Sequence, residues 1–129
     1  MKITTILAFG AAAAFALASQ SAQAAGDAAA GAQVFKTKCF VCHTIDKGAA
    51  AKVGPNLFGI VGHAAGKSPS YTGKYTEDMM KAGLTWDEAT LDKYLEEPKK
   101  LVPKTKMTFP GLKDVKDREN LIAYMNTMK

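Results

Sequence analysis

The chain has 129 residues, of which 47% are apolar and 22% are charged, and its formal net charge at pH 7 is +5. This length and composition predict a single globular domain and exclude a disordered chain or a membrane protein with several spans. Because the chain has only two cysteines, a framework of several disulfides is also excluded.

The N-terminal segment has the pattern of an export signal. A lysine follows the initial methionine, residues 3–18 are almost entirely apolar, and small residues stand at Ala22 and Ala24. Such a pattern is typical of a secretory signal peptide, and we expect cleavage after Ala24 or Ala25. An uncleaved membrane anchor is the alternative, but the apolar run is shorter than the roughly 20 residues that a bilayer span needs.

The domain organisation follows from that cleavage. We expect residues 1–24 to be removed and residues 25–129 to form one domain in a bacterial periplasm, monomeric and without stable membrane insertion. Lys2 is the only charged residue of the removed segment, so the net charge of the mature chain is +4. A domain of this size buries only about two-thirds of its unfolded surface, so we expect a bound group to help stabilise it.

Helix signals flank a long loop in the first part of the mature chain. Asp27 can cap a helix that runs to about Lys38, and Thr76 opens a short helix that Gly83 ends. Between them, residues 44–74 contain six glycines and two prolines and show little periodicity. Loops this long in a small domain are usually functional, so we predict that this segment folds over another group.

Two further helices are predicted toward the C-terminus. Thr85–Glu88 has the spacing of a capping box, and the helix that it opens ends before Pro98. Asp114 begins the last helix, with Arg118 and Glu119 on the solvent side. The predicted inward faces are Ala89, Leu91, Tyr94 and Leu95 on the first of these helices, and Val115, Leu121, Ile122, Met125 and Met128 on the second.

The segment between these two helices carries no helical pattern. Residues 98–112 contain three prolines, and we predict a loop there. No part of the mature chain indicates a pair of strands, so the fold class is predicted to be all-α, with about four to five short helices and long loops.

One short motif indicates the chemistry. Cys39 and Cys42 are three residues apart and His43 follows directly, which is the attachment signature of a c-type haem. Two thiols at this spacing can add across the two vinyl groups of one haem, and the adjacent imidazole then faces the iron. Export agrees with this interpretation, because bacteria attach haem covalently outside the cytoplasm.

Two other uses of these residues are less favoured. A thioredoxin-type redox pair should follow a strand and open a helix, whereas Cys39 and Cys42 follow a predicted helix and precede a loop. A zinc site could combine this motif with His63, but adjacent Cys42 and His43 would crowd one ion and the usual second ligand pair is missing.

A haem iron needs a second axial ligand or keeps an open position. The candidates are His63, Met79, Met80, Met107, Met125 and Met128. Core packing explains Met125 and Met128 on the last helix, and it could also explain the two methionines of the short helix. Met107 lies in a polar loop between two prolines, where no helical face would bury it, so we predict that Met107 is the ligand. A histidine and methionine pair fills both axial positions and raises the reduction potential.

With these residues in place, the mature chain resembles the class I c-type cytochromes, most of all the cytochrome c2 group of purple bacteria and its mitochondrial relatives. The resemblance covers essentially the whole mature domain. Its landmarks, in order, are Gly31 and Phe35, Cys39–His43, Gly54–Leu57, Tyr75–Thr76, Leu84–Trp86, Tyr94–Leu95, Pro98–Lys100, Thr105–Phe109 and Leu121–Met125. It implies a small cytochrome c fold around one covalently bound haem c, with Gly31 allowing the first and last helices to approach closely.

The resemblance also implies a set of ligands. Cys39 and Cys42 would hold the haem vinyl groups, and His43 and Met107 would bind the iron from opposite sides. The Pro55 carbonyl would accept a hydrogen bond from His43, a contact that fixes the ring tautomer and tunes a metal.

Other side chains would surround the haem propionates. By the same resemblance, Tyr75 and Trp86 would donate to the inner propionate and Thr105 to the other one, while Tyr94 would contact the region of the Met107 sulfur. Core packing is an alternative role for Trp86 and Tyr94.

Several positions depart from the family pattern, and two of them bear on the surroundings of the haem. His63 stands where an arginine usually lies near the propionates, so its role stays open. Met79 stands where mitochondrial members have a buried asparagine, which puts the usual buried-water network near Tyr94 in doubt.

The basic charge suggests how such a protein would meet its partners. Lysines flank both ligand segments, and charge complementarity speeds protein association. The expected docking lysines are Lys38, Lys52, Lys99, Lys100, Lys104 and Lys106. The resemblance implies acidic partners: a cytochrome bc1 complex as donor, and a photosynthetic reaction centre or cytochrome oxidase as acceptor. Nucleic-acid binding, the rival use of a basic face, is not expected of an exported haem protein.

The function predicted from the sequence is therefore one-electron transfer rather than catalysis. The alternatives are a haem enzyme such as a peroxidase and a sensor that binds CO or NO. Both would need an open or labile iron position, and no polar distal base is evident near Met107.

Overall fold

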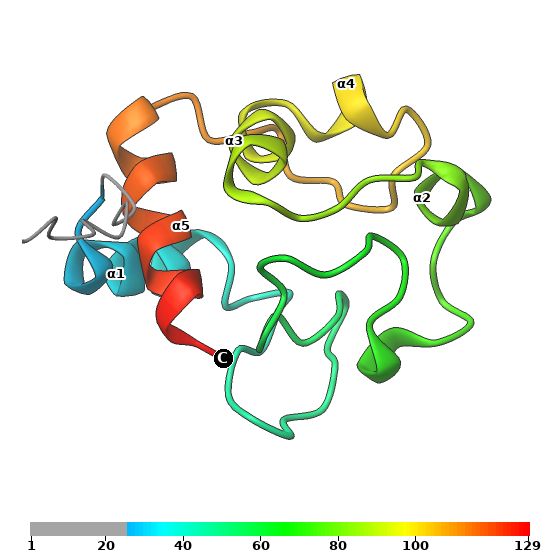
Figure 1. The fold of residues 1–129 in the computed structure, drawn as a ribbon, viewed down its shortest axis with the longest axis horizontal. Coiled ribbons are helices and arrows are strands. Elements are labelled where there is room, and N and C mark those ends of the chain that lie inside the picture. The colour runs from blue at the N-terminus through cyan, green and yellow to red at the C-terminus, as the bar shows by residue number, and fades with distance from the viewer. Residues whose placement is uncertain (1–25) are drawn as a thin grey trace, which may run out of the picture.

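Short helices joined by long loops make up the fold, and the computed structural model describes residues 26–129 of it (Figure 1). Its helices are α1 (Ala28–Lys38), α2 (Glu77–Lys81), α3 (Glu88–Glu96), α4 (Pro98–Leu101) and α5 (Val115–Thr127), with one 3-10 turn, η1 (Pro69–Tyr71). Over residues 26–129 there is no strand, only an isolated antiparallel bridge between Ala64 and Thr85. The predicted all-α class is confirmed. The expected signal, residues 1–24, and both cleavage positions lie outside the described residues.

The two terminal helices, α1 and α5, pack across each other at one end of the molecule (Figure 1). Asp27 caps α1 by accepting a hydrogen bond from Ala29 N–H at 2.8 Å, as predicted. Gly31 is buried at the crossing, where a Cβ would collide with the backbone carbonyl of Asn120. The glycine therefore permits the close approach of the two helices.

Helix α2 follows the prediction and α3 begins later than expected. Thr76 Oγ1 accepts from Met79 N–H at 3.2 Å and so caps α2. The cap of α3 is Asp87, whose carboxylate accepts from Thr90 N–H at 2.7 Å, and not Thr85. The reason is that Thr85 is held in the isolated bridge to Ala64, which keeps its backbone outside the helix.

Helix α4 was not expected, because the three prolines of residues 98–112 suggested a loop. Pro98 occupies the first turn of α4, where a proline needs no N–H partner and its fixed φ suits a helix. Ala89, predicted to face inward from α3, is exposed because it lies two residues before the buried Leu91 and therefore on the opposite side of the helix.

In helix α5 the observed burial differs from the prediction at two positions. Its cap, Asp114, is as expected, and Leu121, Ile122 and Met125 are buried. Val115 is exposed because it occupies the first position of the helix, before the packed turns begin. Arg118, expected in solvent, is 5% exposed because Asp92 on α3 pairs with it.

The apolar core is arranged around a central cavity. Trp86, Leu91, Tyr94, Leu121 and Met125 are buried, and each of them also lines that cavity. Residues 44–75 form loops that close the side of the molecule away from α3 and α4 (Figure 1). The predicted loops therefore cover a space that the helices leave open.

Candidate metal centre

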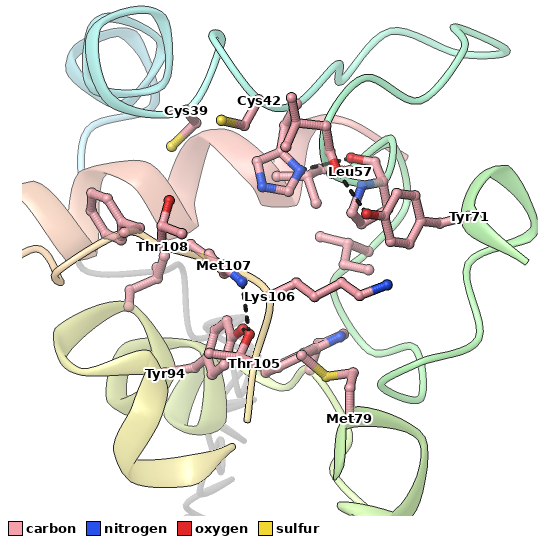
Figure 2. A pocket seen from close by; sticks show the side chains of 18 of the residues that line it. Cys39, Cys42, Leu57, Tyr71, Met79, Tyr94, Thr105, Lys106, Met107 and Thr108 are labelled. Carbon is pink, nitrogen blue, oxygen red and sulfur yellow. Dashed lines mark hydrogen bonds between the residues drawn. The ribbon is translucent and has the colours of Figure 1, made fainter. Parts of the chain in front are cut away.

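The cavity has a volume of about 540 Å³ and is lined by segments that lie far apart in the sequence. Residues at the end of α1, the 53–60 loop, the 71–79 segment, α3, the 105–110 loop and α5 all contribute to its wall. Its volume is within the range of pockets that hold small molecules and cofactors, about 300–1,000 Å³. Figure 2 shows the side chains that surround it.

The two cysteines of the sequence motif lie together on this wall, with their sulfur atoms beside each other (Figure 2). Both are half-buried free thiols. Burial, with a smaller contribution from Cys42, raises the pKa of the Cys39 thiol to about 11. A thioredoxin-type nucleophile needs a lowered thiol pKa, so this environment does not suit a redox disulfide pair.

His43 lies beside them and is fixed by the loop that follows. Its Nδ1 lies 2.8 Å from the Pro55 carbonyl oxygen, the contact that the resemblance implies. Burial lowers the pKa of His43, and the bond to Pro55 opposes that change only in part. A lowered pKa favours the neutral ring, and the contact at Nδ1 leaves Nε2 without a hydrogen bond to Pro55, as imidazole ligation of a metal would require.

Gly54 leaves the space that the His43 ring occupies. A Cβ at Gly54 would collide with Cε1 of the ring. Gly54 N–H also donates to the Cys42 carbonyl at 2.8 Å, which ties the loop to the cysteine motif. Sequence reasoning noted this glycine only as a family landmark, because the ring that it accommodates is 11 residues away along the chain.

Met107 lies on the loop that forms another part of the wall. It is half-buried and lines the cavity, and its N–H donates to Thr105 Oγ1 at 3.2 Å. The same hydroxyl group lies 2.9 Å from the hydroxyl of Tyr94. Tyr94 thus supports the Met107 loop through Thr105, and burial raises the pKa of Tyr94.

The other candidate axial ligands divide into two groups. His63 and Met80 are exposed, and neither they nor Met128 line the cavity. Met79 and Met125 are buried and do line it. Among the described residues, therefore, three of the candidate thioethers can reach the cavity, and that of Met107 is the one on a loop.

Tyr75 and Trp86 line the cavity as well. Trp86 is buried with its ring centroid 4.8 Å from that of Tyr94, so it also packs the core. The pKa of Tyr75 is raised by burial, while hydrogen bonds with Ser68 oppose the change. The ring of Tyr75 stands edge-on to that of Tyr71, with 5.0 Å between centroids.

The six expected docking lysines do not all lie at the cavity. Lys38 and Lys106 line it, and Lys52 packs against Phe40 inside the cysteine motif. Lys99, Lys100 and Lys104 are exposed on α4 and the following loop and do not line the cavity.

Two residues missed by sequence reasoning close the wall. The Tyr71 hydroxyl donates to the Val53 carbonyl at 2.6 Å, and Lys106 Nζ donates to the Lys74 carbonyl at 2.6 Å. Tyr71 therefore links the 71–75 segment to the 53–60 loop, and Lys74 links it to the 105–110 loop that carries Met107. No local pattern signals either contact, because the partners lie 18 and 32 residues away.

The donor set fits the expected haem. Two thiols, one neutral imidazole and thioethers line a wall that is otherwise largely apolar, with Leu57, Ile60 and Leu91 among its side chains. A zinc site is not supported, since no group of three His, Cys, Asp or Glu side chains within the described range could hold a metal ion. Nor does any helix in that range have the length and apolar character needed to cross a membrane.

Comparison with known proteins finds one matching family model and several relatives. The protein-family model described as cytochrome c matches residues 28–129. Cytochrome c2 of Rhodomicrobium vannielii is 51% identical over 109 residues, covering 84% of this chain and 85% of that protein. Cytochrome c of Kluyveromyces lactis is 50% identical over 95 residues, covering 74% of this chain and 84% of that protein. The solved structure of cytochrome cH from Methylobacterium extorquens has a TM-score of 0.72 and 44% identity, covering 79% of this chain and 99% of that one.

Proposed function

Because this chain belongs to the cytochrome c family and is a class I c-type cytochrome, we propose that it shuttles single electrons between membrane redox complexes in a bacterial periplasm. Members of this family carry one covalently attached haem c and transfer electrons rather than catalyse a reaction. The chain is accordingly an electron carrier and not an enzyme. Its compartment, axial ligands and partners are the finer parts of the proposal.

The observation that carries the proposal is the set of donors that line one cavity. Cys39 and Cys42 would tether the haem through thioether bonds, while His43 Nε2 and the Met107 sulfur would bind its iron. When bound, the haem supplies an iron that changes between the ferrous and ferric states. If His43 and Met107 both bind the iron, a substrate would have no place to bind the metal.

The chain's own residues keep that arrangement fixed. The Pro55 carbonyl holds the His43 ring, and the pair of hydroxyls on Tyr94 and Thr105 supports the backbone at Met107. The largely apolar wall would leave a bound haem little contact with water, so little solvent reorganisation would accompany a change of charge in the cavity. Ligands that are held in place and apolar surroundings both suit rapid electron exchange.

The charge at the cavity favours acidic partners. The lining residues include Lys38, Lys74 and Lys106 and contain no aspartate or glutamate. Charge complementarity of this kind raises association rates more than affinity, as a shuttle requires. A cytochrome bc1 complex as donor and a reaction centre or cytochrome oxidase as acceptor match this need.

Exchange of the proposed axial ligand tests the function. In Met107→Ala the iron should gain an open position, so the reduced protein should bind CO readily at neutral pH while the unaltered protein does not. The reduction potential should fall by on the order of 0.1 V, within the range of about 0.8 V that axial ligands span. Absorption spectra and a redox titration measure both effects.

Other methionines provide the controls for this test. Met80→Ala, at an exposed position outside the cavity, should leave the spectrum and potential unchanged. If another thioether of the cavity were the ligand, Met79→Ala or Met125→Ala would open the iron position instead. An unchanged spectrum in Met107→Ala would refute the proposed ligand, and ready CO binding by the unaltered protein would favour a gas sensor instead.

Export is tested independently by the mass of the purified haem protein. Protein isolated from the periplasm should begin at Ala25 or Gly26, with residues 1–24 or 1–25 missing. A full-length mass in the cytoplasmic fraction would contradict the proposed compartment.

A further inference from the structure

The cavity wall carries positive charges that no carboxylate of the wall offsets. Lys38, Lys74 and Lys106 line the cavity, whereas no aspartate or glutamate does. A haem brings two propionate carboxylates, and a carboxylate at an apolar cavity needs a cation or hydrogen-bond donors to offset its loss of water. At least one of these lysines therefore has the charge to meet an anion that the cofactor itself would supply.

The attachment chemistry indicates which side of the cavity would receive the carboxylates. The two vinyl groups of a haem lie on one side of the porphyrin, and its two propionates lie on the other. Thioethers to Cys39 and Cys42 would hold the vinyl side at the end of α1, where Lys38 directly precedes Cys39. Figure 2 shows Thr105 and Lys106 away from the two sulfur atoms. The carboxylates would therefore face the 71–75 segment and the 105–110 loop rather than Lys38.

Of the two lysines on that side, only Lys74 has a free ammonium group. Lys106 Nζ donates to the Lys74 carbonyl at 2.6 Å, a contact that also holds the backbone of Lys74 at the cavity. Within residues 26–129, Lys74 Nζ has no ion-pair partner, and its contact is with the Tyr71 ring, 5.7 Å from the centroid. That distance is close to the outer limit of a cation–π contact, about 6 Å. The Lys74 ammonium is thus a cation at the cavity without a counter-ion.

His63, the other candidate for this charge, lies outside the cavity. It occupies the position at which the family pattern has an arginine near the propionates. In this structure, however, its side chain is exposed and does not line the cavity. The charge expected at that position therefore has to come from another residue.

We propose that Lys74 is the cationic partner of a haem propionate in this protein, in place of His63. Tyr75, the next residue, lines the same cavity and would add a hydrogen-bond donor. The 71–75 segment would then both cover the haem and balance part of its charge. The inference rests on the proposed function, in which the two cysteines tether the haem.

Infrared spectroscopy tests the contact directly. The haem-loaded protein is prepared with and without heavy-isotope carbon in the two propionate carboxyl groups, so that the difference spectrum isolates their stretching bands. Lys74→Gln should shift at least one of these bands, because the anion loses a charge-assisted hydrogen bond. His63→Gln should leave them in place. A shift in His63→Gln with none in Lys74→Gln would overturn the assignment.

A redox titration gives a second measurement. Removing a positive charge near the iron favours the ferric state, which carries one more positive charge than the ferrous state. At the midpoint potential of the original protein, Lys74→Gln should therefore lower the ratio of reduced to oxidised haem at least about twofold. Lys74→Arg keeps the charge and should change the ratio less.

A lysine of the same loop supplies the matched control. Lys67 is exposed and does not line the cavity, so Lys67→Gln removes the same charge without removing the proposed contact. It should leave the propionate bands unchanged and alter the redox ratio less than Lys74→Gln does. Equal effects of the two substitutions would show that only net charge matters and would refute the contact.

The neighbouring ammonium group is tested separately. Lys106→Gln keeps the Lys74 ammonium, so at least one propionate should retain its partner and its band. A band shift in Lys106→Gln with none in Lys74→Gln would assign the contact to Lys106 and overturn the inference.

Failure of the inference is distinguishable from failure of the proposed function. The mass of the protein reports whether one haem is covalently attached, and its absorption spectrum with and without CO reports the axial ligation. If both are as proposed while Lys74→Gln leaves the propionate bands unchanged, Lys74 is not their partner. If no haem is attached to the cysteines, the proposed function is wrong and the inference falls with it.

Discussion

At the scale of single residues, Arg118 is a buried cation that three segments share. Its Nε donates to Asp92 Oδ1 at 2.6 Å, and one guanidinium nitrogen donates to the carbonyls of Leu112 at 2.8 Å and Lys113 at 3.1 Å. A buried charge is costly unless it is paired and its donors are satisfied. Helix α3, helix α5 and the loop that precedes α5 therefore depend on one side chain for their mutual placement.

Removing that side chain should destabilise the fold more than removing its charged partner. Arg118→Ala leaves two carbonyls and a carboxylate without their donor and should lower the free energy of unfolding by about 3 kcal/mol. Asp92→Asn should cost less, about 1–2 kcal/mol, because the asparagine oxygen can still accept from the arginine, the side chain at this position is 40% exposed and the arginine keeps both carbonyls. Guanidinium unfolding of the haem-loaded proteins measures both values, and equal losses would contradict this account.

At the scale of helices, the starts that depend on local chemistry were predictable and those that depend on distant partners were not. Asp27, Thr76 and Asp114 each cap a helix through their own side chains. The cap of α3 moved to Asp87 because of a bridge to a residue 21 positions earlier. Likewise, periodicity placed Arg118 in solvent because it carries no information about Asp92, 26 residues away.

The crossing of α1 and α5 should tolerate no side chain at Gly31. Gly31→Ala would force a Cβ into the Asn120 carbonyl and push the helices apart, with a loss of about 2–3 kcal/mol in unfolding free energy. Gln33→Ala, at an exposed position of the same helix, should change it by less than about 0.5 kcal/mol. Thermal unfolding monitored by far-UV circular dichroism makes the comparison, and a neutral Gly31→Ala would show that the crossing is looser than described.

The cap of α3 should make a pH-dependent contribution. Hydrogen bonds from Thr90 lower the pKa of Asp87 below its usual 3.8. A carboxyl whose pKa is lowered by folding stabilises the native state fully above its unfolded pKa, and that stabilisation is lost as the pH falls through the folded pKa. The difference in melting temperature between the original protein and Asp87→Ala should therefore be largest at neutral pH and shrink below pH 3.8.

Asparagine at the same position is the matched control. Asp87→Asn keeps an acceptor for the helix N-terminus but cannot titrate in this range. Its advantage over Asp87→Ala should stay constant with pH. A constant advantage of the original aspartate down to strong acid would refute the assigned cause.

At the scale of the whole molecule, the candidate metal centre combines short motifs that are visible in the sequence with residues that only the fold brings to the cavity. The cysteine motif, His43 and the Met107 loop were recognisable because their chemistry lies in short stretches. Tyr71 and Lys74 were not, since their contacts join loops that are remote along the chain. Charge shows the same contrast, because the lysine total was evident but the absence of any acidic residue from the cavity lining required the structure.

This uneven distribution of charge makes ionic strength the most direct test of docking. Long-range attraction between a basic cavity edge and an acidic partner raises the association rate by about 10- to 1,000-fold at low salt. We expect the second-order rate constant with a bc1 complex or an oxidase to fall at least about tenfold between roughly 0.01 M and 0.1 M salt, as the Debye length shortens from about 30 Å to about 10 Å. Lys106→Gln, at the cavity, should weaken this dependence more than Lys81→Gln, because the charge of Lys81 is already balanced by Glu77 at 2.9 Å. A rate constant that does not respond to salt, or equal effects of the two substitutions, would contradict electrostatic docking at the cavity edge.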